Sequence, residues 1–208
     1  MLAAMAAPAD ASSFPPADAL RVLAAELRAE GPEVAGQVVE ADAEPVLGML
    51  VAAGPRCVAA PGEYAAVIES IREGFLLHYG SPRLLVAADP DLRLLVGDHL
   101  YARGIERLVQ LEDLLAIGEL SDLISLSAQL DAAAPDSKAA SDILWVATCV
   151  AIAAGPSDSH ERDKASLREA GDPEPLLRGA RQAAGASHLS AALDLAFEAV
   201  ESPAADRG

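Results

Sequence analysis

The chain has 208 residues, a length typical of one domain. Of these residues 52% are hydrophobic and only 3% are aromatic, so the core should consist mainly of Leu, Ala, Val and Ile. A net charge of −17 disfavours binding to nucleic acid and to anionic membranes, which both attract Lys and Arg. The two cysteines, Cys57 and Cys149, lie among apolar residues and outside any CxxC or Cys/His pattern, which argues against a zinc site and predicts reduced core thiols.

Residues 1–15 are rich in Ala and Pro and predict a disordered tail, residues 16–202 one helical domain, and residues 203–208 a polar C-terminal tail. The N-terminal segment lacks the basic residues of a signal peptide, and the longest apolar run, Ile143–Gly155, is too short to span a bilayer. We therefore expect a cytoplasmic protein without a transmembrane segment.

The first helix is predicted over Pro16–Glu30. Its apolar face has the three-and-four spacing of a helix and consists of Leu20, Leu23, Ala24 and Leu27. A second helical region, residues 33–53, should be interrupted near Pro45, and a third, residues 62–80, should end at Gly80.

Helical patterns continue to the C-terminus. Five more helices are expected over residues 89–111, 112–134, 136–155, 172–185 and 187–202. Asp89 should cap the first of these five and Ser187 the last, while the segment 136–155 is apolar nearly all round and should be the most buried. Because no strand pattern or fixed-length repeat competes, the predicted fold class is all-α, a compact bundle of about seven to nine helices.

Four short motifs in the middle of the chain share the order and spacing of a known enzyme class. The first, "ESIRE" at Glu69–Glu73, is followed by four residues and then by "HYGSP" at His78–Pro82. Fifteen residues separate Pro82 from Asp98, which lies in the third motif, "LLVGDHLYA", and a later helical segment begins at Lys138.

In this arrangement the chain resembles the trans-isoprenyl diphosphate synthases (polyprenyl synthetases) over residues 45–155, in a shortened and degenerate form. The resemblance implies an all-α bundle of the isoprenoid synthase fold. Members of that family condense an allylic diphosphate with isopentenyl diphosphate. Mg²⁺ ions held by aspartates on two facing helices neutralise the diphosphate, arginine and lysine complete its shell, and an apolar cavity holds the isoprenoid chain.

The resemblance gives several residues expected positions in such a site. Glu69 and Glu73 stand at the first aspartate-rich motif, DDxxD, and are one helical turn apart, so they are a weak Mg²⁺ candidate. We favour the interpretation that they are two solvated acids on a helix flank. The next motif, RRGxP, is matched by Gly80 and Pro82, with His78 and Tyr79 in place of the two arginines.

The sequence lacks most of the cationic side chains that a diphosphate site needs. Neither His78 nor Tyr79 supplies the donor fork of a guanidinium, and His78, beside a tyrosine before the helix end, is expected to be a hydrogen-bonded packing residue. Arg83 lies nearby, but a single arginine does not restore a diphosphate clamp. Lys138 matches the lysine of the family's later helix.

Other parts of the family pattern are missing. Asp42 and Glu44 stand where the family has a basic motif, and the second aspartate-rich motif has no counterpart after Gly155. Asp158 and Asp163 lie there in a charged segment that predicts a solvated loop or a short exposed helix. We therefore expect no catalytic residue, no bound metal and no cofactor, with Mg²⁺ only if an altered site on Glu69 and Glu73 operates.

Gly97 and Asp98 are expected to be fold markers. Gly97 should allow close helix approach, and Asp98 should cap a helix or form a side-chain hydrogen bond. Asp98, His99 and Tyr101 should not converge, because they lie on one helix.

The leading functional hypothesis is a non-catalytic protein similar to the small or regulatory subunit of heteromeric polyprenyl diphosphate synthases. Such a subunit pairs with a catalytic subunit and helps to set product chain length, and Ala102 and Gly104 would suit a close interface around an apolar isoprenoid chain. A homodimer is the other assembly considered. Two functional alternatives stay open: an isoprenoid-acting enzyme with the altered Mg²⁺ site, or an all-α interaction or ligand-binding module unrelated to isoprenoids.

Overall fold

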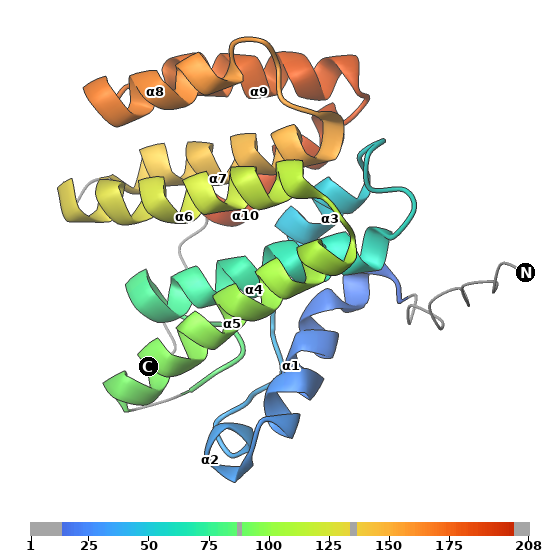
Figure 1. The fold of residues 1–208 in the computed structure, drawn as a ribbon, viewed down its shortest axis with the longest axis vertical. Helices are drawn as coiled ribbons and strands as arrows, with labels where there is room; N and C mark the ends of the chain where they lie inside the picture. The colour runs from blue at the N-terminus through green and yellow to red at the C-terminus, as the bar shows by residue number, and fades with distance from the viewer. Residues whose placement is uncertain (1–13, 87–88, 134–136, 202–208) are drawn as a thin grey trace, which may run out of the picture.

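The structure is a computed structural model that describes residues 14–86, 89–133 and 137–201 (Figure 1). Within these ranges the chain forms ten α-helices and no β-strand, which confirms the predicted all-α class. The tails expected over residues 1–15 and 203–208 lie outside the described residues except for Phe14 and Pro15. Phe14 packs against a small alanine-rich cluster, so the packed domain extends at least to this residue.

The helices follow one another with short connections. After a 3-10 turn, η1 (Pro16–Asp18), their bounds are α1 (Ala19–Ala29), α2 (Pro32–Ala35), α3 (Val46–Ala52), α4 (Pro61–Tyr79), α5 (Pro90–Gln110), α6 (Leu114–Ala133), α7 (Lys138–Ala154), α8 (His160–Ala170), α9 (Glu174–Ala186) and α10 (Ser190–Glu201). Within the described ranges, none of these helices is long and apolar enough to cross a membrane.

The helix number exceeds the expected seven to nine for two reasons. The segment 33–53 separates into α2 and α3, because the chain between them runs alongside the loop after α4, where Val39 N–H donates to the Leu84 carbonyl at 2.9 Å. The charged segment after Gly155 forms α8, a three-turn helix with a partly buried face. Ser187 does not cap the last helix as predicted but ends α9, and α10 begins at Ser190.

The bundle is stacked in layers (Figure 1). The α8–α9 pair forms one end, α6 and α7 come next, α4 and α5 follow, and α1 with α2 forms the other end. As predicted, α7 is buried along most of its length. The predicted apolar face of α1 is also buried and forms a second core with the side of α5 that carries Val96 and Leu100.

Small residues let α4 and α5 approach each other closely. A Cβ atom on Gly97 would lie 2.7 Å from His78 Nε2, and one on Gly104 would lie 2.7 Å from Ile71 Cδ1. The prediction for Gly97 is therefore confirmed. Gly104 is used inside the chain, against α4, so it is not available for the partner interface expected for it.

Candidate functional site

The two glutamates of the first motif lie on the inner side of α4. Glu69 and Glu73 are both 0% exposed, so the prediction of solvated acids on a helix flank is wrong. Removing two carboxylates from water is energetically costly, so they need positive charge or hydrogen-bond donors close by. The surroundings of the two side chains therefore decide what the site can do.

Arg83 supplies the positive charge. Its Nη1 lies 2.8 Å from Glu69 Oε2, and its Nε donates to Glu73 Oε2 at 3.0 Å. Burial opposes the charge on Arg83, but the coulombic attraction of Glu69 and Glu73 outweighs it, and the pKa of Arg83 is raised. We call Glu69, Glu73 and Arg83 the buried ionic cluster.

Backbone donors complete the shells of the two carboxylates. Glu73 Oε1 accepts the N–H groups of Arg83 at 2.6 Å and Leu84 at 2.7 Å, so the chain after α4 is bound to the helix itself. Glu69 Oε1 accepts the N–H of Gly48 at 2.8 Å, which connects α4 to α3. The cluster thus holds together three segments of the fold.

This donor set does not fit Mg²⁺. The ion prefers octahedral oxygen ligands and usually retains several waters. Here three of the four carboxylate oxygens accept hydrogen bonds, and the fourth, Glu69 Oε2, faces the guanidinium of Arg83. A metal at this position would have to displace Arg83. Within the described residues, no group of three or more His, Cys, Asp or Glu side chains is arranged to hold a metal ion.

A cation–aromatic stack on α4 lies close enough to the buried ionic cluster for Glu69 and Arg83 to act on the charge of Arg72. The Arg72 guanidinium carbon lies 4.7 Å from the ring centroid of Trp145 and 5.4 Å from that of Phe75. Burial, helped by the charge of Arg83, lowers the pKa of Arg72. Arg72 and Trp145 were not predicted as site residues, although Trp145 is the chain's one tryptophan and tryptophan is a common core anchor.

Several buried polar atoms have no hydrogen-bond partner among the described residues. They include Arg83 Nη2, Trp145 Nε1 and Thr148 Oγ1. Such atoms are usually satisfied by ordered water.

His78 has the packing role expected for it. The His78 ring stacks on Tyr101 with centroids 5.4 Å apart, and its Nε2 lies 3.1 Å from Asp98 Oδ1. Tyr79 is 43% exposed and contacts Phe75. Asp98 and Tyr101 both contact His78 from α5, whereas His99 pairs with Glu30, so the three residues do not converge as one cluster.

The remaining motif residues hold helix ends. Lys138 Nζ binds Asp142 at 2.5 Å and the Val200 carbonyl at 2.6 Å, which joins α7 to α10. Gly80 ends α4, and its carbonyl accepts a hydrogen bond from Arg93 at 3.0 Å. Pro82 lies half-buried in the loop before Arg83. The partners of Lys138 are Asp142 and the Val200 carbonyl rather than the buried ionic cluster, so in the described part of the chain the six predicted residues do not form one site.

A second buried cluster of charges was missed. Glu119 on α6 accepts from His160 Nε2 at 2.9 Å and Lys164 Nζ at 3.3 Å, and Lys164 also reaches Asp122 at 2.6 Å. Burial would raise the pKa of Glu119, but its hydrogen bond to His160 and the nearby positive charges lower it. Of the two aspartates expected in a solvated segment, Asp163 is half-buried and accepts a hydrogen bond from Ser159.

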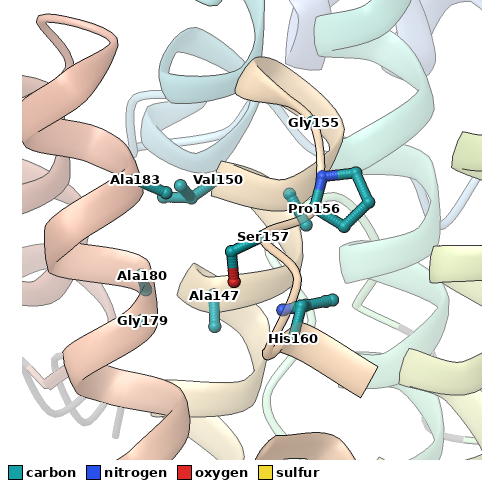
Figure 2. A pocket seen from close by; sticks show the side chains of 10 residues that line it. Ala147, Val150, Gly155, Pro156, Ser157, His160, Gly179, Ala180 and Ala183 are labelled. Atoms are coloured by element: carbon teal, nitrogen blue, oxygen red, sulfur yellow. The ribbon is translucent and has the colours of Figure 1, made fainter. Parts of the chain in front are cut away.

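A small pocket adjoins His160 (Figure 2). It lies between the end of α7, the loop before α8, and α9, and small side chains such as Ala147, Gly179 and Ala183 line it. Its volume of about 10 Å³ is enough for about one water molecule. The pocket therefore has no room for an organic substrate.

Both cysteines are free and buried, as predicted. Burial raises the pKa of the Cys57 thiol to about 12 and also raises that of Cys149. Neither is an activated nucleophile.

Comparisons of the chain with known protein families, with curated proteins and with solved structures found no match.

Proposed function

We propose that the chain is a non-catalytic subunit of the isoprenoid synthase type that acts together with a catalytic polyprenyl diphosphate synthase. The observation that carries this proposal is the buried ionic cluster. At the position where the resembled motif would bind Mg²⁺, Arg83 forms ion pairs with both Glu69 and Glu73 inside the fold. The family resemblance supports the enzyme class, and the cluster supports loss of independent chemistry.

The charges available to a diphosphate support the same conclusion. A leaving diphosphate needs positive groups that are free to bind it in the transition state. Arg83 is committed to the two glutamates, Lys138 to Asp142, and His78 to Asp98 and Tyr101. Arg72 is stacked on aromatic rings. A diphosphate would therefore have to compete with the present partners of these groups.

The proposed role as a subunit rests on the helical scaffold that the chain would retain. A helical scaffold without its own chemistry can still pair with a catalytic chain and alter the apolar space that receives the growing isoprenoid. The expected effect is a change in product chain length or in activity. Such an effect requires a protein partner and no metal on this chain.

Co-expression tests the proposal directly. The chain, carrying an affinity tag, is produced together with a catalytic polyprenyl diphosphate synthase from its own host, and the purified material is assayed for prenyl transfer with and without this chain. We expect co-purification and a shift in product length or rate. Recovery of the synthase alone, with unchanged products, would contradict the proposal. A chain that loses the partner-facing surface described below serves as the matched control.

A further inference from the structure

One face of α5 carries exposed apolar residues at a regular spacing. Leu95, Ala102 and Val109 are each seven residues apart, so they form one stripe along a helix. Leu95 is 67% exposed and Val109 is 61% exposed, and Ala102 is exposed between them. Exposed large apolar side chains in such a row are typical of interaction surfaces.

The other side of α5 is occupied by the fold. Val96, Leu100 and Leu108 are buried, and α5 packs along α4 and touches α6 beside the turn that joins them. The stripe points away from these contacts, because its positions lie on the side of the helical wheel opposite the buried ones. Among the described residues, no element packs on the stripe.

Acidic residues flank the apolar ones. Asp91, Asp98 and Glu106 are exposed on the same face, and the side chain of Asp98 is 73% exposed. Glu106 has an ion pair with Arg103, whereas the contact of Asp98 with His78 leaves most of its surface open to solvent. The face is thus an apolar stripe with negative charge beside it.

This charge selects the kind of partner. A two-fold antiparallel pairing of α5 with a second copy, centred on Ala102, would place Leu95 opposite Val109 but also Asp98 opposite Glu106. Like charges facing each other disfavour that assembly, and the chain's net charge of −17 adds to the repulsion. An anionic membrane is disfavoured for the same reason.

We propose that the outer face of α5 docks an amphipathic helix of another protein that carries apolar residues at seven-residue spacing and Lys or Arg beside them. The apolar residues would contact Leu95, Ala102 and Val109, and the basic ones would approach Asp98 and Glu106. For the proposed subunit function, this surface specifies where the partner would bind and which residue types the partner would present. The docking itself does not require an isoprenoid.

A peptide experiment tests this surface in the full chain. The probe is a synthetic helical peptide of three heptads with Leu at seven-residue spacing and Lys beside it; its matched control has Glu in place of Lys. Binding is measured by isothermal titration to the wild type, to Leu95→Gln with Val109→Gln, to Asp98→Asn with Glu106→Gln, and to Leu195→Gln. Leu195, 55% exposed on α10, is the control for an unrelated exposed leucine.

We expect the Lys peptide to bind the wild type and Leu195→Gln equally. The Leu95/Val109 variant should bind about tenfold or more weakly, because burial of these side chains is lost. The Asp98/Glu106 variant should lose the salt dependence of binding. Equal binding of the Lys and Glu peptides, or unchanged binding to the Leu95/Val109 variant, would overturn the proposal. The proposal would also be overturned if light scattering detected a dimer of the wild type and a monomer of the Leu95/Val109 variant. These outcomes are independent of whether a prenyl synthase is recovered in co-expression.

Discussion

Arg83 Nη1 lies 2.8 Å from Oε2 of Glu69, a side chain that is 0% exposed in the middle of α4. The contact places a guanidinium where the resembled enzyme motif would place a metal ion. Glu69 and Glu73 have the spacing of a reaction-centre motif, but here they hold the loop after α4 against the helix.

Removing the guanidinium should be strongly destabilising. In Arg83→Met, two buried carboxylates lose their positive partner, and breaking a buried pair in this way costs about 3–5 kcal/mol. The free energy of unfolding is measured by urea denaturation. The matched control is Arg83→Met combined with Glu69→Gln and Glu73→Gln, which removes the unpaired charges. If the single variant is as stable as the wild type, the ionic cluster does not stabilise the fold.

Acid should weaken the α6–α8 contact. The pKa of Glu119 is lowered in the folded state, so its contribution to stability is present above its unfolded value of about 4.3 and is lost as the pH falls through the folded value. We expect the urea midpoint of the wild type to fall as the pH drops below about 4.3, and to fall less in Glu119→Gln. Identical pH profiles for the two proteins would show that Glu119 does not provide this linkage.

Close helix contact should make Gly74 intolerant of a side chain. A Cβ atom there would lie 3.0 Å from the Gly97 carbonyl and 2.9 Å from Tyr101 Cδ1, so Gly74→Ala should cost about 1–3 kcal/mol. The control is Gly118→Ala on α6, where a Cβ atom would meet nothing within 4 Å. That change should stabilise the helix by about 0.5–1 kcal/mol. Thermal or urea unfolding of both variants distinguishes the two sites.

The thiols should react slowly in the folded protein. Cys57 and Cys149 are buried and their pKa values are raised, so little thiolate is present at neutral pH. Mass spectrometry after iodoacetamide treatment should show no labelling under native conditions and two labels in urea. Rapid native labelling of either cysteine would contradict the described burial.

The sequence predicted local features well where they depend on neighbouring residues. Asp89 caps α5 as expected, since its Oδ1 accepts the N–H of Asp91 at 2.9 Å. The apolar face of α1 is buried as predicted from its spacing alone. Ser187 failed as a cap because its own N–H still belongs to the last turn of α9.

The site could not be predicted in the same way, because its contacts are distant in the sequence. Glu69 receives its backbone donor from Gly48, 21 residues earlier and on another helix. His160 meets Glu119 across 41 residues. Neither spacing has a local signature. Arg83 differs, because an arginine that follows two glutamates of one helix face within a few residues indicates that a buried ion pair is possible.

Prenyl transfer by the purified chain alone tests the central claim most directly. The wild type and the Glu69→Gln/Glu73→Gln variant are incubated with Mg²⁺, a radiolabelled isopentenyl diphosphate and an allylic diphosphate, and the extracted products are counted. We predict no product above background from either protein, since Arg83 occupies the two carboxylates of the wild type and the variant lacks them. Mg²⁺-dependent product from the wild type that disappears in the variant would contradict the account and establish these glutamates as a working metal site.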